Sequence, residues 1–170
     1  MAAMVFASTM CLSIKGIPTP TGPVMLKTAN AICLLGGLLF GGWRGGLAAG
    51  MGSAIFDLMS EYAAESPVTL VRFFLFAFLC GTIAWWGKRA PTLGRAAVAV
   101  VVACAFDFCF NIGKNILLLL VAGSAFGPAV VANIPKMVAA GINIAIAIPV
   151  SVLLYHLIYP RLERAGLLHR

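Results

Sequence analysis

Charged residues are scarce in this chain, at 10% of its 170 residues, whereas ordinary soluble domains have about 25%. Acidic residues are the scarcest, with five against twelve basic ones and a formal net charge of +7. Hydrophobic residues make up 62% of the chain, and the mean hydropathy is +1.03. So few charges cannot cover the surface of a soluble domain, and the composition therefore indicates an integral membrane protein.

Sequence signatures of metal, nucleotide and catalytic chemistry are also missing. The glycine-containing segment 81–89 departs from a phosphate-binding loop, because five residues separate its glycines and an arginine follows its lysine. No cofactor is expected on this chain, and any ATP must be bound by a partner. No grouping of His, Asp and Ser suggests an enzyme. The cysteines stand singly in apolar segments and are expected to be packing residues rather than metal ligands: Cys11, Cys33, Cys80, Cys104 and Cys109.

The apolar residues form long continuous runs rather than alternating patterns, which favours membrane helices over a β-barrel. A hydrocarbon core of about 30 Å needs roughly 20 residues per helical span, so the length allows about six spans. The fold class predicted is an all-α six-transmembrane-helix bundle that forms one domain over residues 1–170. Proline and glycine turns divide the predicted spans, which cover residues 2–17, 29–40, 45–62, 69–86, 96–121 and 135–159.

Basic residues in the connections predict the orientation, because they collect on the cytoplasmic side of membrane proteins. With both termini in the cytoplasm, only Lys15 and Lys27 lie in outer loops. The basic pI then needs no nucleic-acid partner, and the expected location is the bacterial plasma membrane as a multi-pass protein. Seven basic residues fall inside in this topology: Arg44, Lys88, Arg89, Arg95, Arg161, Arg164 and Arg170.

Polar residues inside the last three predicted spans are the candidates for function, because lipid-facing positions do not tolerate them. Four of them recur at helical spacing in the fifth span, three share a face of the sixth, and one lies near the start of the fourth. In the predicted topology they line a pocket at mid-membrane or in the outer half, suited to a small polar solute. They are Asp107, Asn111, Lys114 and Asn115, then Asn133, Lys136 and Asn143, and Arg72.

Several of these residues also have structural interpretations. Asp107 can neutralise Lys114 or Lys136, since charges inside membranes usually pair. Asn133 precedes Pro135 by two residues, a pattern that favours a helix N-cap over a solute contact. Asn143 lies deep in an apolar run, so its amide is expected either to bridge helices or to touch solute.

Small residues indicate where helices approach closely. The pairs Gly37/Gly41, Gly42/Gly46 and Gly46/Gly50, each four residues apart, predict close contact between the second and third spans. Ala3 and Ala7 have the same spacing in the first span, where they form a small-residue groove for a helix of another subunit. The acidic series Asp57, Glu61 and Glu65 follows one face at the outer end of the third span. Its later members are expected in solvent.

The stretch 41–58, Gly-Gly-Trp-Arg-Gly-Gly-Leu-Ala-Ala-Gly-Met-Gly-Ser-Ala-Ile-Phe-Asp-Leu, is the most specific segment of the chain. Together with Ser-Pro-Val-Thr-Leu at 66–70 and the proline-containing first outer loop, it resembles the substrate-binding S components of energy-coupling factor (ECF) vitamin transporters. The likeness covers nearly the whole chain. The segment 25–29 departs from the family, with Lys27 where a Gly-Asp type turn is expected.

The resemblance implies a function in vitamin uptake and no enzyme activity. In that family the vitamin binds near the outer face, using helices four to six and the outer loops. The motif matched by Ala3 and Ala7 contacts the transmembrane T subunit. The loaded S component then reorients in the membrane, and the T subunit and two ATPase subunits drive release of the solute inward.

Two other functions stay open on the sequence alone. One is a membrane scaffold similar to the rod-shape-determining protein of cell-wall elongation, and the other is a small stand-alone secondary transporter. The solute is also open, with pyridoxine-like, pantothenate-like and pyrimidine-like ligands all fitting such a pocket. The cations Arg72, Lys114 and Lys136 point to an anionic or acceptor-rich solute, unless Asp107 cancels one of them.

Overall fold

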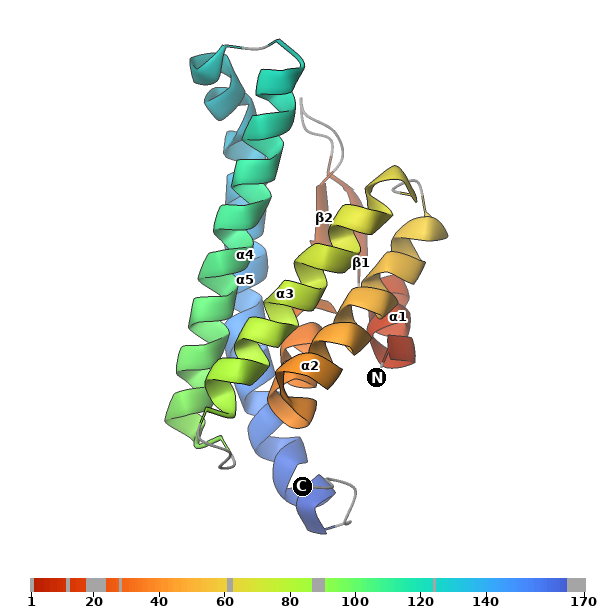
Figure 1. The fold of residues 1–170 in the computed structure, drawn as a ribbon, viewed down its shortest axis with the longest axis vertical. Helices are drawn as coiled ribbons and strands as arrows, with labels where there is room; N and C mark the ends of the chain where they lie inside the picture. Colours follow the sequence, from red (N-terminus) through yellow and green to blue (C-terminus); the bar gives the residue numbers. More distant parts are fainter. Residues whose placement is uncertain are drawn as a thin grey trace.

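The computed structural model describes residues 2–11, 13–17, 24–27, 29–60, 63–86, 91–123 and 125–164. Helices make up nearly all of this part of the chain, and the one sheet in it is a two-stranded hairpin (Figure 1). A 3-10 turn, Ala63–Glu65, leads into the third helix. The elements in chain order are α1 (Ala2–Cys11), β1 (Ser13–Ile17), β2 (Val24–Lys27), α2 (Ala29–Leu58), α3 (Ser66–Ala84), α4 (Leu93–Val121) and α5 (Phe126–Arg164).

Helix α2 is divided at Gly41, which has a φ of 78° and a ψ of 175° inside an otherwise helical segment. Glycine tolerates this left-handed φ because it has no Cβ. The two halves fold back on each other, since a Cβ on Gly45 would lie 2.5 Å from the carbonyl oxygen of Gly36. Nine residues of straight helix would hold these positions roughly 13 Å apart. The predicted break between the second and third spans is therefore confirmed.

Helix α3 packs into the glycine-lined surface of this α2 hairpin. A Cβ on Gly37 would lie 2.4 Å from the carbonyl oxygen of Ala77, and one on Gly50 would lie 2.8 Å from that of Leu70. The prediction that these glycines join the second and third spans is confirmed for Gly37 and wrong for Gly42, Gly46 and Gly50, which face α3. The two halves of α2 meet where a Cβ on Gly45 would lie 2.5 Å from the carbonyl oxygen of Gly36 and 2.7 Å from the Cα of Gly37.

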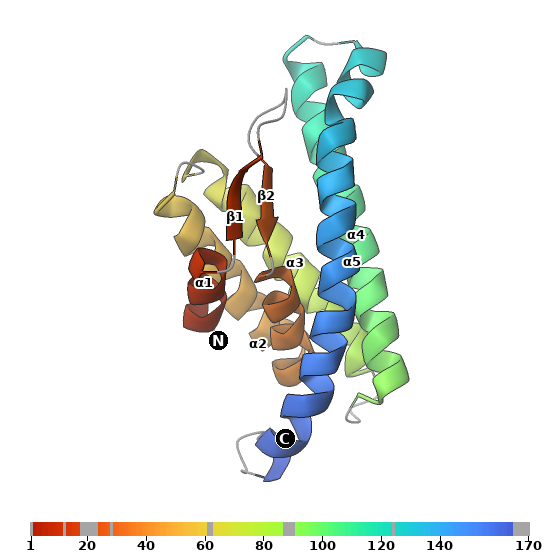
Figure 2. The same cartoon turned by 180° about the vertical axis from the view of Figure 1, so that it is seen from behind.

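The first predicted span is shorter in the structure than in the sequence prediction. Helix α1 ends at Cys11, and residues 13–17 form strand β1, which pairs antiparallel with β2 in the register Ser13 to Lys27 and Ile14 to Leu26. A hairpin satisfies the backbone of this segment without a helix. It packs against α5, as the view from behind shows (Figure 2). The proline-containing segment 18–23 lies outside the described residues.

Helix α5 begins at Phe126, well before the predicted start of the last span at residue 135. Pro135, Pro149 and Pro160 all lie inside the helix rather than at its ends. Prolines are tolerated in membrane helices when neighbouring groups satisfy the freed carbonyls. The sequence prediction placed the boundary at the first of these prolines, and the structure carries the helix through it.

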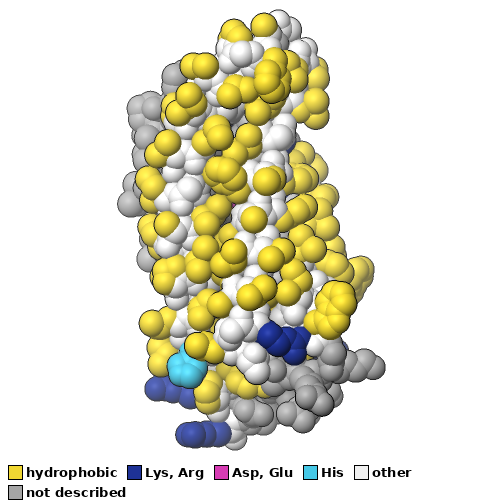
Figure 3. Space-filling view, turned by 90° about the vertical axis from the view of Figure 1, so that its left-hand side faces the viewer, with side chains coloured by type: hydrophobic (Ala, Val, Ile, Leu, Met, Phe, Trp, Pro, Cys, Tyr) yellow, Lys and Arg dark blue, Asp and Glu magenta, His cyan; other side chains and the backbone are white. Residues whose placement is uncertain are grey.

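Among the described residues, four helical segments are long and apolar enough to cross a membrane, the first of them counted across the break at Gly41: Asn30–Leu58, Ala63–Ala84, Leu93–Val121 and Phe126–Leu162. The face over α4 and α5 is mostly hydrophobic, and its lysine and arginine side chains are confined to the lower part (Figure 3). A multi-pass membrane protein follows from these helices. We call the end formed by the close of α3, the start of α4 and the close of α5 the basic end, and the end at the start of α3 the opposite end.

Gly81 tests the close packing of α2 against α3, because a Cβ there would lie 2.3 Å from the backbone nitrogen of Gly42. We expect Gly81→Ala to lower the free energy of unfolding by about 1–3 kcal/mol, since rigid backbone must shift to admit the methyl group. Gly113→Ala is the matched control, because a Cβ on that helical glycine meets nothing within 4 Å. Thermal unfolding in detergent, followed by helical circular dichroism, measures both. Equal melting temperatures for the two variants would contradict the packing described.

Candidate functional site

The inner face of α4 changes from apolar to polar along its length. Near the basic end it consists of buried small residues such as Ala99 and Ala103, both 0% exposed. Helical spacing of three or four residues continues the same face through Asp107, Asn111 and Lys114. Asp107 is 4% exposed, whereas Asn111 and Lys114 are half-buried. The bundle is therefore dry and apolar at the basic end, and polar and more open toward the opposite end.

Arg72 and Asp107 form an ion pair between α3 and α4. The guanidinium donates two hydrogen bonds to the carboxylate, from Nε at 2.6 Å and from Nη2 at 2.8 Å. The guanidinium carbon also lies 5.2 Å from the centre of the Phe73 ring. Asp107 was expected to pair with Lys114 or Lys136. That expectation is wrong, because Arg72 reaches both carboxylate oxygens in the two-pronged geometry that lysine does not offer.

A second group of charges lies farther toward the opposite end. Lys114 donates to Glu65 at 2.7 Å, which ties α4 to the turn before α3. Lys136 of α5 is half-buried and within electrostatic range of both. Glu65 was expected to be only a solvated surface residue. Its side chain is 54% exposed, yet it is the ion-pair partner of Lys114. The sequence signal for this role was its place directly before the Ser66-Pro67 start of α3.

Amide side chains make up the rest of the candidate residues. On α4, Asn115 donates from Nδ2 to Oδ1 of Asn111 at 3.1 Å. On α5, Asn133 is 1% exposed and donates from Nδ2 to the carbonyl oxygen of Ala129 at 2.9 Å. Its Oδ1 has no hydrogen-bond partner among the described residues. Asn143 is half-buried on the same helix.

The N-cap interpretation of Asn133 is wrong. Helix α5 starts at Phe126, so Asn133 lies two turns inside it, and its side chain bonds back to the carbonyl four residues earlier. A buried amide oxygen without a donor is unfavourable by a few kcal/mol in an apolar interior. A donor supplied by a solute or by water would relieve this. Among the candidate residues, Asn133 thus has the strongest physical reason to accept a hydrogen bond from a solute or from water.

The structure also buries polar residues that the sequence prediction left out of the site. Asn30 and Ser53 are buried in the two halves of α2, at 7% and 4% exposed, and Asp57 is 3% exposed one turn after Ser53. The Sγ of Cys33 and the Oγ of Ser53 lie 3.9 Å apart, which connects the halves. Asp57 also lies within electrostatic range of Arg72. The polar interior therefore extends from α4 across α3 toward α2.

Ala3 and Ala7 lie on an exposed face of α1. Both side chains are exposed, as is Met10 at 61% on the same face. The opposite face of α1 packs on α2, where Val5 is buried and the Phe6 ring makes an edge contact with Phe56 at 6.5 Å between centroids. The small-residue groove is thus open in this chain, as the prediction of a partner interface requires.

Comparisons with known proteins connect this arrangement to one family. A sequence model described as the S component of ECF-type riboflavin transporters matches residues 1–160. A solved structure described as "Structure and mechanism of the S component of a bacterial ECF transporter" is similar, with 21% identity and a TM-score of 0.58 over 99% of this chain and 93% of that one. At this identity the structural likeness shows the fold alone. No curated protein matches.

The two ion pairs differ in burial and therefore in expected contribution to stability. Side chains of Arg72 and Asp107 are 19% and 6% exposed, whereas Glu65 is 54% exposed beside Lys114. We expect Arg72→Met to lower the free energy of unfolding by about 3–5 kcal/mol, because it leaves a buried carboxylate without its partner. Lys114→Met is the matched control and is expected to lower it by about 1 kcal/mol or less. Unfolding in detergent measures both free energies. An equal loss in the two variants would rule out the buried ion pair of Arg72 and Asp107.

Proposed function

Because the chain belongs to the family of S components of ECF-type riboflavin transporters, we propose that it is the substrate-binding subunit of such an importer. We propose riboflavin, or a flavin close to it, as the solute. The geometric observation that supports this most is the change of the inner α4 face from Ala99 and Ala103 to Asp107, Asn111 and Lys114. It places the polar side chains of this α4 face toward the opposite end of the membrane-spanning bundle.

The chemistry of the candidate site suits an uncharged solute. Arg72 is neutralised by Asp107 and Lys114 by Glu65, so two of the three cations have anionic partners within the chain. The groups left for recognition are mainly amides, with Lys136 as one additional donor. Riboflavin is uncharged, with a flat aromatic ring system, an imide edge and a hydroxyl-bearing chain. Amides serve as both donors and acceptors for such groups.

Aromatic side chains flank the polar stripe. The Phe106 and Phe110 rings lie 5.9 Å apart on α4 at an angle of 33°, one turn from each other and next to Asp107 and Asn111 in sequence. An apolar face beside a few oriented polar groups is the usual composition of a small-molecule site. We propose that these rings cover the flat part of the solute while Asn111, Asn115, Asn133 and Asn143 bond its edges.

The proposed topology places the opposite end outside the cell and the basic end in the cytoplasm, with six spans and both termini inside. The family assignment implies a T subunit and two ATPase subunits, which supply the energy that this chain does not. Ala3 and Ala7 are proposed as the contact with the T subunit. The scaffold and secondary-transporter interpretations are set aside because the chain belongs to the S-component family.

A flavin titration tests the proposed site directly. We expect Asn111→Ala, Asn133→Ala and Lys136→Ala each to weaken riboflavin binding by about tenfold, because each removes one hydrogen-bonding group from the solute. Quenching of riboflavin fluorescence by the purified protein gives the affinity. Ser151→Ala is the control. Ser151 is buried on α5, as Asn133 is, but its hydroxyl donates to the carbonyl oxygen of Ile148 near the basic end. Wild-type affinity in all three site variants would reject the site while leaving the family assignment intact.

Assembly with the T subunit tests the role proposed for Ala3 and Ala7. We expect Ala3→Trp and Ala7→Trp to leave riboflavin affinity unchanged but to prevent co-purification of the T subunit, because an indole fills the open groove on α1. Val131→Trp is the control, as Val131 is 64% exposed on α5 and away from α1. Normal co-purification of the T subunit with Ala3→Trp and with Ala7→Trp would place the interface elsewhere.

A further inference from the structure

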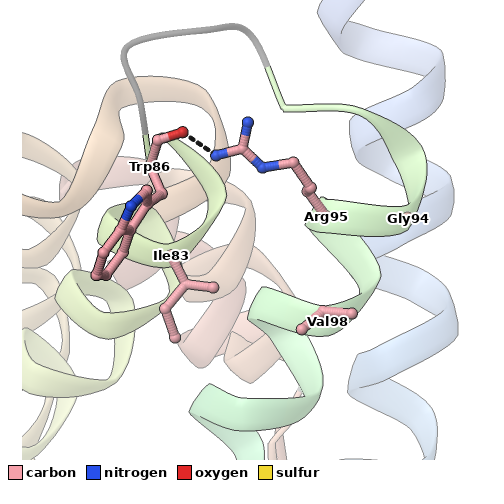
Figure 4. Close-up of a pocket in the computed structure, with 5 residues that line it drawn as sticks. All are labelled: Ile83, Trp86, Gly94, Arg95 and Val98. Atoms are coloured by element: carbon pink, nitrogen blue, oxygen red, sulfur yellow. Dashed lines mark hydrogen bonds between the residues drawn. The ribbon is translucent and has the colours of Figure 1, made fainter.

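A pocket of about 260 Å³ lies between the close of α3 and the start of α4, at the basic end (Figure 4). It is separate from the candidate solute site, whose residues lie toward the opposite end on α3, α4 and α5. Its walls come from Ile83 and Trp86 on one side and from Gly94, Arg95 and Val98 on the other. None of these residues has a role in the proposed function.

The pocket combines one cation with apolar walls. The guanidinium of Arg95 donates from Nη2 to the backbone carbonyl of Trp86, which holds it across the mouth between the two helices (Figure 4). Its remaining N–H groups have no acceptor among the described residues and can donate to a ligand. Ile83 and Val98 lie deeper along the helices, and the Trp86 indole is 76% exposed beside them.

The apolar part of the pocket continues onto the outer surface of α4. Val98, Val101 and Val102 are 58%, 49% and 43% exposed and follow the helix away from the basic end. This segment belongs to a helix that is long and apolar enough to cross a membrane. A ligand with its charge at Arg95 can therefore lay a hydrocarbon tail along these valines without leaving the bilayer.

The positive charges around the pocket favour a negatively charged ligand. Arg44, Arg161 and Arg164 are exposed at the same end, and the sequence between Trp86 and the start of α4 contains Lys88 and Arg89. Tryptophan and arginine together are typical of the headgroup level of a membrane. Basic clusters at that level attract anionic lipids.

We propose that this pocket binds an anionic phospholipid. The lipid phosphate accepts hydrogen bonds from the free N–H groups of Arg95, and the first part of an acyl chain lies against Ile83 and Val98. Free phosphate fits less well, because it gains nothing from the apolar walls and would lose part of its own hydration beside them. The bound lipid joins the end of α3 to the start of α4 at the basic end.

Native mass spectrometry of the intact protein, released from nanodiscs of phosphatidylglycerol or of phosphatidylcholine, tests the proposal. The wild type is expected to retain one phosphatidylglycerol at least tenfold more often than phosphatidylcholine. Arg95→Gln is expected to reduce this retention about tenfold, because the charge-assisted contact to phosphate is lost. Arg161→Gln is the matched control and keeps the adduct, since Arg161 is exposed at the same end but does not line the pocket.

A second variant keeps the proposal testable if Arg95→Gln fails to fold. Val98→Trp fills the pocket while leaving Arg95 in place, and it is expected to exclude the lipid and to preserve riboflavin affinity. Retention of phosphatidylglycerol in both pocket variants would overturn the proposal, as would equal retention of phosphatidylcholine by the wild type. Displacement of the lipid by millimolar sodium phosphate would also overturn it in favour of a free-phosphate site.

Discussion

A hydrocarbon environment offers no hydrogen-bond partner, and this constraint governs where every polar group of the bundle lies. Arg72 and Asp107 satisfy each other across α3 and α4, so a charged residue on each helix becomes a link between them. Because that link must lie inside, it fixes which faces of α3 and α4 meet. The polar stripe of Asn111 and Lys114 then follows from helical periodicity toward the opposite end.

The close packing of α2 on α3 makes room for this polar interior. Glycines let the two backbones approach within a distance at which side chains cannot intervene, as at Gly37 beside Ala77 and Gly81 beside Gly42. The dry core of that region is then built from leucines of α2, small residues and the rings of Phe73 and Phe76. Helices α4 and α5 cover the remaining side of α3 and carry the amides. Close backbone packing is thus concentrated between α2 and α3, and the amides of the candidate site lie on α4 and α5.

Composition and helical spacing were enough to predict a membrane-helix bundle, the break at Gly41 and the polar stripe of α4, because each depends on residues close together in sequence. Long-range contacts were not predictable in this way. Asp107 pairs with a residue 35 positions away, whereas spacing alone had suggested a nearer lysine. Strand β1 was missed because Ile14 and Ile17 read as part of an apolar helix until their partner strand is known. The N-cap predicted for Asn133 is wrong because α5 starts at Phe126 and continues through Pro135.

Internal neutralisation also bears on the reorientation that the family resemblance implies for a loaded S component. Moving one unpaired elementary charge through a membrane potential of 100 mV changes the free energy by about 2.3 kcal/mol. Arg72 with Asp107 and Lys114 with Glu65 form pairs of opposite charge, so a body that moves with both pairs carries no net charge from them. Lys136 is the remaining cation of the candidate site. A monovalent anionic solute would cancel the charge of Lys136, whereas an uncharged one leaves that charge to move with the site. The same pairing that stabilises the bundle in lipid therefore limits the charge that the site contributes to the motion to one elementary charge.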